Sequence, residues 1–235
     1  MKALSPSKNL AIASILGFGT AHAALTAPIG TVNNNANITA IYGGGNPNNS
    51  WVTSSVDDIT VGVRFKERST LNFGTTDGLG GTTFTVGVNV NLDFTVSSGS
   101  APLSGYKFIL SVDRNASLSQ TWTTIDVTSM YPDNSFGTSA TANGAGLEGL
   151  WSTYATTNTV AQNSQRSFWL TIPGNPTPDA GQYNVALTAY NVSDVGFTNP
   201  IAQTVSTLTV VPEPSSSLAL ALSTIGFLTI RRRQR

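Results

Sequence analysis

The sequence predicts an all-β protein with the architecture of an antiparallel β-sandwich, and three observations support this prediction. Apolar residues alternate with small or polar ones over long stretches, as in residues 82–96, which is typical of strands with one buried and one wet face. Pieces rich in Gly, Pro and Asn separate these stretches. Between residues 24 and 211 no stretch has the 3.6-residue period of an amphipathic helix.

The predicted strands share this alternation, with a bulge or bend expected at Gly87 in the second of them. Their apolar positions are Ile59, Val61, Val63 and Phe65; the even-numbered residues of 84–94; Tyr106, Phe108, Leu110 and Val112; Phe168, Leu170 and Ile172; Tyr183, Val185, Leu187 and Ala189; and the last strand covers residues 201–211. Residues 132–165 are mostly small and polar, and we expect a long polar insert there, with a short strand or helical turn near residues 147–154.

Residues 1–23 have the layout of a secretory signal peptide. Lys2 and Lys8 supply the basic region, residues 10–18 are largely apolar, and Ala21 and Ala23 are the small residues that signal peptidase accepts. The alternative, an N-terminal membrane anchor, needs about 20 apolar residues, and this run is much shorter. We therefore expect export and cleavage after Ala23, with residues 24–211 as the β-sandwich domain.

The composition of this expected body excludes several functions. The single histidine, His22, lies in the signal peptide, and the chain has no cysteine. Ser-His-Asp, Cys-His and ordinary zinc sites therefore lack their residues, and we expect neither a metal nor another cofactor. The body carries six basic and eleven acidic side chains, a formal net charge of −5, so it lacks the basic face that nucleic-acid binding requires.

Residues 179–191, DAGQYNVALTAYN, place Asp179, Gly181 and Tyr183 at the spacing of a tyrosine corner. The segment resembles the one before the second cysteine of immunoglobulin domains, in which the tyrosine hydroxyl bonds to upstream backbone. Val185 takes the cysteine's place, so the resemblance implies an Ig-like sandwich broadly and not an antibody-type domain. The alternative is an ordinary turn that leads into an amphipathic strand.

One hydrolytic chemistry needs neither histidine nor cysteine, the cleavage of glycosidic bonds by two carboxylates. The candidate acids are Asp57, Asp58, Asp113, Asp126, Asp133 and Glu148. Aspartate is also common at turns and strand ends, where it accepts local hydrogen bonds. We therefore expect no enzymatic activity, and we keep a carboxylate-dependent glycan hydrolase as the third hypothesis.

Aromatic side chains suggest a second hypothesis, a carbohydrate-binding module. Trp151 and Tyr154 lie in the polar insert, and Trp169 lies on the opposite side of its predicted strand from Phe168 and Leu170. If exposed, these rings could stack on sugars. The ordinary role of large aromatics is to fill a core, and we expect that role for Trp122.

The C-terminal residues 211–235, VPEPSSSLALALSTIGFLTIRRRQR, form a tripartite tail. Pro212, Glu213 and Pro214 come first, the apolar segment 215–230 follows, and Arg231, Arg232, Arg233 and Arg235 end the chain. As a helix, residues 218–230 would span about 20 Å, short of the ~30 Å hydrocarbon core, so a permanent anchor is the less favoured alternative. The arginines would keep the C-terminus in the cytoplasm.

This order of features resembles the PEP-CTERM sorting signal of Gram-negative bacteria, over residues 212–235. The resemblance implies a partner, an exosortase-type membrane protease, and transient insertion of a short hydrophobic helix into the inner membrane. It further implies removal of the tail near Pro-Glu-Pro, release to the cell surface or outside the cell, and an association with exopolysaccharide and biofilm. Our first hypothesis is therefore an exported, non-enzymatic surface or matrix protein.

Overall fold

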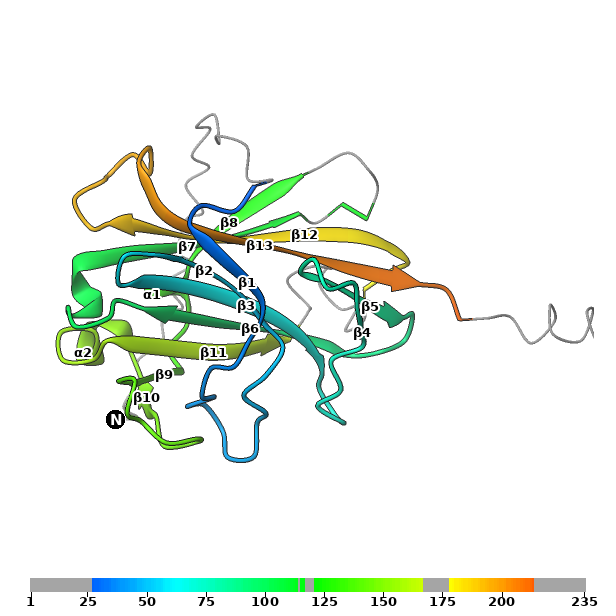
Figure 1. Cartoon of the computed structure of the whole chain (residues 1–235), viewed down its shortest axis with the longest axis horizontal. Coiled ribbons are helices and arrows are strands. Elements are labelled where there is room, and N and C mark those ends of the chain that lie inside the picture. The colour runs from blue at the N-terminus through cyan, green and yellow to red at the C-terminus, as the bar shows by residue number, and fades with distance from the viewer. Residues whose placement is uncertain (1–26, 114, 117–120, 167–177, 214–235) are drawn as a thin grey trace, which may run out of the picture.

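Two β-sheets packed face to face form the protein, as the alternating sequence predicts (Figure 1). The computed structural model describes residues 27–113, 115–116, 121–166 and 178–213. The predicted signal peptide, the strand expected at residues 168–172 and the hydrophobic helix of the tail lie outside the described residues. In Figure 1, one sheet forms the upper layer and the other the lower layer.

The first layer is a seven-stranded sheet. Its strands lie in the order β1 (Thr31–Ala36), β2 (Trp51–Val56), β3 (Ile59–Glu67), β6 (Val90–Ser97), β11 (Val160–Arg166), β9 (Asn134–Gly137) and β10 (Leu147–Gly149). Every pair of neighbours in this sheet is antiparallel.

The second layer is a six-stranded sheet. Its order is β4 (Thr75–Thr76), β5 (Gly81–Thr85), β13 (Pro200–Val211), β12 (Gly181–Asn191), β7 (Tyr106–Asp113) and β8 (Trp122–Asp126). Neighbours are again antiparallel, except that β5 and β13 run parallel.

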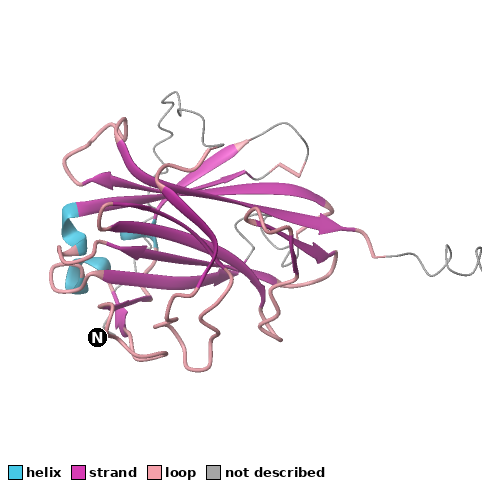
Figure 2. Cartoon of the chain, in the orientation of Figure 1, coloured by secondary structure: helices cyan, strands magenta, loops and turns pink. Residues whose placement is uncertain are grey.

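Helix is scarce in the described part of the chain (Figure 2). It consists of a 3₁₀ turn at Leu103–Gly105 (η1) and two single-turn helices, α1 (Val127–Met130) and α2 (Trp151–Tyr154). Asp126 caps α1, because its carboxylate accepts the backbone N–H of Thr128 at 2.9 Å.

The hydrophobic core lies between the sheets and is built by the predicted alternation. Val61, Val63 and Phe65 of β3 face inward and are almost fully buried, as are the alternate residues of β6, β7 and β12. Their neighbours along each strand point to the outer faces. The core prediction from strand period is therefore confirmed for these strands.

The stretch 84–94 is two strands and not one. Its first part belongs to β5 and its second to β6, and these strands lie in different sheets. Gly87 lies at the break with φ +91°, a conformation that other residues rarely adopt, and the backbone N–H of Val88 bonds back to Thr85. The bend expected at Gly87 is thus a complete crossover between the layers.

The region 132–165 differs from the long polar loop that we expected. It contains β9, β10, α2 and most of β11, and β11 lies between β6 and β9. The strand escapes the hydrophobic pattern because it buries the amides Gln162 and Asn163, which form hydrogen bonds within the sheet and its covering loops. The short elements at residues 147–154 lie where a strand or helical turn was expected.

The tyrosine-corner contact is present. The hydroxyl of Tyr183 donates to the backbone carbonyl of Asp179 at 3.1 Å, four residues upstream at the start of β12. Gly181 lies between them with φ +150°, and a side chain there would meet the carbonyl oxygen of Ala116 at 2.4 Å. The Asp-x-Gly-x-Tyr spacing therefore reflects a real backbone contact.

We predict that Tyr183→Phe lowers the free energy of unfolding by about 1 kcal/mol, because it deletes this hydrogen bond and keeps the ring. Urea unfolding followed by tryptophan fluorescence measures the change. Tyr106→Phe is the matched control, since Tyr106 is half-buried against the same core and its hydroxyl has no hydrogen bond within the described residues. Equal effects of the two substitutions would contradict a stabilising corner.

Candidate functional site

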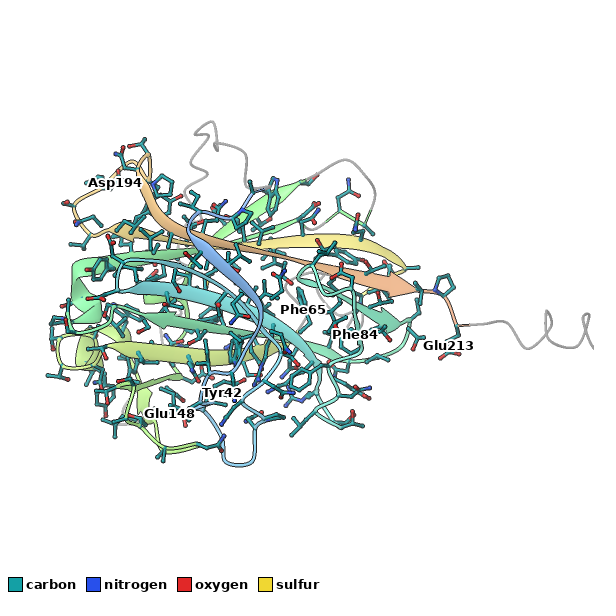
Figure 3. The ribbon with its side chains drawn as sticks, in the orientation of Figure 1. Tyr42, Phe65, Phe84, Glu148, Asp194 and Glu213 are labelled. Carbon is teal, nitrogen blue, oxygen red and sulfur yellow. The ribbon has the colours of Figure 1, made fainter. Side chains whose placement is uncertain are left out.

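Polar and charged side chains joined by hydrogen bonds and ion pairs lie on the outer face of the seven-stranded sheet. This is the face turned away from the other layer. Register brings together side chains from the central strands β3, β6 and β11. Arg64 lies opposite Asp93, Gly62 lies opposite Thr95, and Thr95 lies opposite Gln162. The loop of residues 37–50, which we call the covering segment, packs across this face. Figure 3 shows Tyr42 of this segment on the far side of the sheet from the core residue Phe65.

Beneath the covering segment lies a buried charge cluster made of Tyr42, Arg64, Lys66 and Asp93. Oδ2 of Asp93 contacts Nε of Arg64 at 2.8 Å and Nζ of Lys66 at 3.1 Å. The Tyr42 hydroxyl also donates to this oxygen. The other oxygen, Oδ1, has no hydrogen-bond partner among the described residues. The Tyr42 hydroxyl also accepts from Nη2 of Arg64 at 2.7 Å and from Nζ of Lys66 at 3.4 Å, so Oδ2 of Asp93 and this hydroxyl together join the cluster.

The cations of the cluster also hold the covering segment. Nη1 of Arg64 donates to the backbone carbonyls of Pro47 at 2.6 Å and Asn49 at 2.8 Å, and Nζ of Lys66 donates to Oδ1 of Asn46 at 2.6 Å. The Arg64 guanidinium lies 4.2 Å from the centroid of the Trp51 ring, within cation–π range. These contacts tie a loop without regular structure to a fixed place on the sheet.

Burial governs the titration of the cluster. It raises the pKa of Tyr42 far above its ordinary value, and the negative charge of Asp93 adds to that effect. Burial lowers the pKa of Lys66, and the attraction of Asp93 opposes this shift. In the folded protein the tyrosine therefore stays neutral well above the pH at which an exposed tyrosine ionises.

Next to the charge cluster, the same face has a groove of about 410 Å³. Thr53, Thr60, Thr95 and Gln162 form part of its floor, and they come from four different strands. Residues 36–39 form one wall and residues 138–141 include the other. No lining residue carries a charge, and all of them belong to the described part of the chain.

Gln162 fixes the floor and one wall of the groove. The side chain is fully buried; its Nε2 donates to the backbone carbonyl of Thr39 at 2.9 Å and to the hydroxyl of Thr95 at 3.1 Å. Its Oε1 accepts the backbone N–H of Ile41 at 2.8 Å. The groove is therefore built around a satisfied amide and does not depend on a mobile side chain.

The aromatic residues that we considered as sugar platforms in the second hypothesis lie elsewhere. Trp151 and Tyr154 belong to α2 and pack against the core, with the Trp151 ring 5.5 Å from Phe136 and 5.8 Å from Phe108. The Tyr154 ring also lies 5.5 Å from Phe136. The Trp151 and Tyr154 rings are therefore packed against other aromatic rings of the protein. Trp169 lies outside the described residues.

The other tryptophans are divided between the two layers. Trp51 is fully buried under the covering segment, beside Arg64. Trp122, for which we expected a core position, begins β8 at the edge of the six-stranded sheet and is half-buried.

The carboxylates that we considered for hydrolysis have structural roles at several positions. Oδ1 of Asp113 accepts the backbone N–H groups of Asn115 and Thr121, Asp126 caps α1, and Asp133 accepts the amide of Asn163. Asp57, Asp58 and Glu148 are exposed, the first two in the turn between β2 and β3. Within the described ranges, no three His, Cys, Asp or Glu side chains group together as metal ligands.

Of the sorting residues, the structure describes Pro212 and Glu213. Both are exposed and follow directly on β13, and Figure 3 shows Glu213 at the end of the molecule where the described chain ends. Ala21, Ala23, Pro214 and the four terminal arginines lie outside the described residues. Among the residues that are described, no helix is long and apolar enough to cross a membrane.

Sequence reasoning missed both the charge cluster and the groove. Arg64 and Lys66 are two residues apart in a strand, which already places both cations on one face. The partners Tyr42 and Asp93 become visible only through the pairing of β3 with β6 and the path of the covering segment. The groove has no comparable signal, since its floor is assembled from threonine and glutamine of separate strands.

Comparison with known proteins gives no relative to transfer a function from. No protein-family model matches the chain, and no curated protein matches it in sequence. The functional argument therefore depends on the chain's own residues.

We predict that Asp93→Asn destabilises the fold by about 3–5 kcal/mol, because it leaves two buried cations without a counter-charge. Urea unfolding measures the loss, and hydrogen exchange of residues 37–50 should rise before global unfolding. Asp58→Asn, in an exposed turn, is the control and should change stability by less than about 0.5 kcal/mol. Similar losses for both variants would argue against the cluster as the clamp.

Alkaline pH should destabilise the fold through buried tyrosines. Burial, with the charge of Asp133, raises the pKa of Tyr131 to about 12, and burial also raises that of Tyr42, whereas both titrate near pH 10 when unfolded. Their contribution is complete below about pH 10 and is lost above it, at up to about 1.4 kcal/mol per pH unit for each group. Urea unfolding at pH values from about 10 to 12 gives the free energy of unfolding as a function of pH. In Tyr42→Phe this free energy should fall less steeply, by up to about 1.4 kcal/mol per pH unit. An unchanged slope would contradict a neutral Tyr42.

Proposed function

We propose that the chain is an exported, non-enzymatic β-sandwich protein of the cell surface or extracellular matrix, sorted through a C-terminal PEP-CTERM signal. The observation that carries this proposal is the junction between body and tail. The last strand, β13, ends at Val211, and the exposed residues Pro212 and Glu213 follow immediately. A processing enzyme could therefore reach the motif without opening the sandwich.

The tail is separable from the fold on physical grounds. Val210 pairs with Phe84 and Val211 with Thr85, so β13 is fully engaged up to its last residue. Pro212 has no backbone N–H with which to continue the ladder. Cutting the chain beyond Glu213 would therefore remove none of the strand pairs that hold the body together.

We further infer that the sandwich is Ig-like. The neighbours β3, β6, β11 and β9 have the order of strands A, B, E and D of an immunoglobulin sheet, and β13, β12, β7 and β8 have the order G, F, C and C′. On this assignment Tyr183 lies near the start of strand F, which is the usual position of a tyrosine corner. Strand order and corner support the assignment independently. The β1–β2 hairpin is then an addition to the fold.

The absence of enzymatic activity is inferred from the chemistry that the body offers. It has no histidine or cysteine, and several of its carboxylates already serve backbone N–H groups or amides. No observation favours the glycan hydrolase. A carbohydrate-binding role is the second candidate, and the polar groove favours it more than the packed rings of Trp151 and Tyr154.

The sorting proposal predicts that Glu213→Ala, and a chain that ends at Val211, change where the protein accumulates. In the producing cells we expect Glu213→Ala to keep the full-length chain in the membrane fraction, because the protease loses its motif. Fractionation, with mass spectrometry of the C-terminus, distinguishes full-length from trimmed protein. Glu148→Ala, at an exposed glutamate of β10, is the control and should be released and trimmed normally. Unchanged release of an untrimmed chain would overturn the proposal.

A further inference from the structure

We propose that the groove on the outer face of the seven-stranded sheet binds a segment of neutral polysaccharide. This inference rests on the proposed function, because an extracellular matrix would supply the polysaccharide. It names the class of ligand that the proposed surface protein would bind. It assigns the binding to the groove and not to the aromatic side chains of α2.

The size of the groove fits a short run of sugar rings. Its volume of about 410 Å³ falls within the range of roughly 300–1,000 Å³ that is usual for small-molecule sites. The two walls, residues 36–39 and residues 138–141, come from segments about a hundred positions apart in the sequence. Both segments line the same groove as the strand residues of the floor, so a bound oligosaccharide would contact both walls and the sheet between them.

The chemistry of the lining matches uncharged sugars. The lining combines hydroxyl residues with apolar ones, namely Thr39, Thr53, Thr60, Thr95, Ser97, Thr138, Ser139 and Thr141 with Ile38, Ile41 and Val160. The hydroxyls of Thr60, Ser97 and Thr138 each already make one hydrogen bond within the protein, to Ser55, Gly99 and Ala140. A pyranose ring has the same mixture, with hydroxyls at its edge and C–H groups on its faces. Hydroxyls can both donate and accept, so the lining can pair with sugar hydroxyls in several orientations.

Charge excludes an acidic ligand. No lining residue is charged, and the cations on the same face, Arg64 and Lys66, are buried and paired with Asp93. A uronic acid or phosphate in the groove would lose its hydration without gaining a counter-charge. The groove therefore favours neutral over acidic polysaccharide.

An extended peptide is also a poor fit. Peptides that add to a sheet do so at an edge, where backbone N–H and C=O groups are free. The floor of the groove lies on strands β2, β3, β6 and β11, which are paired to one another across the sheet. A peptide there would find only side chains and no free backbone groups to pair with. A sugar does not need backbone groups, because its hydroxyls can bond to side chains alone.

The groove is preorganised. Gln162 ties Thr39 and Ile41 to the floor, the charge cluster holds the adjacent residues of the covering segment, and the Thr141 hydroxyl accepts the backbone N–H of Thr138 in the opposite wall. Gly62 lies between Thr53 and Thr95, and a side chain there would come within 2.8 Å of both methyl groups. Little conformational entropy remains to be lost on binding.

The test uses the protein as its producing cells release it, titrated calorimetrically with hexasaccharides of cellulose, mannan, xylan and β-1,3-glucan, and with oligogalacturonate as the acidic comparison. At least one neutral oligosaccharide should bind, and oligogalacturonate should not. Thr60→Phe in the floor and Ser139→Phe in the wall should each weaken binding by at least about tenfold, since the new ring fills the groove. Thr209→Phe, at a half-buried outward position of β13 in the other sheet, should bind as the wild type does.

The groove assignment is overturned if no neutral oligosaccharide binds, if both groove variants bind normally, or if oligogalacturonate is preferred. Circular dichroism checks each variant, and should Thr60→Phe fail to fold, the exposed Ser139→Phe variant decides the outcome. Release and trimming are measured on the same cells. Normal release without oligosaccharide binding refutes the groove alone, whereas abnormal release of the unmodified chain refutes the sorting proposal.

Discussion

The contact between Asp93 and its two cations is the constraint on which the outer face of the seven-stranded sheet depends. Removing three charged side chains from water is costly, and their mutual attraction offsets that cost only while all three remain together. The arrangement also requires one particular path of the covering segment, because Arg64 donates to two of its backbone carbonyls. The cluster thus converts a loop of residues 37–50 into a fixed part of the surface.

The groove inherits its shape from this constraint. One wall continues directly into the segment that the cluster holds, and Gln162 adds a second attachment on the next row of the sheet. Charge is thereby confined under the covering segment, while the neighbouring groove remains neutral and polar. The hydroxyl-lined groove is therefore exposed to solvent, whereas the nearby charges are buried and paired with one another.

The sequence predicted the layers better than the site. Strands β3, β6, β7 and β12 bury apolar residues at every second position, so their period shows them directly. Strands β1 and β11 consist mainly of Thr, Asn, Gln and Ser, so no alternation marks them. β11 is attached through the amides of Gln162 and Asn163, whose hydrogen bonds no local pattern encodes. Tyr183 was predictable because its partner is four residues away, whereas Asp93 and Tyr42 are 51 residues apart and meet only in the folded sheet.

The position of β13 has a mechanical consequence. It is an internal strand, paired with β12 on one side and with the parallel strand β5 on the other, and the chain leaves the sandwich from its end. A force applied through the C-terminus would act along the strand and would load the hydrogen bonds of both ladders together, in shear. An edge strand pulled sideways would instead lose its bonds one after another. The sandwich should therefore resist mechanical unfolding by a force applied at its C-terminal end.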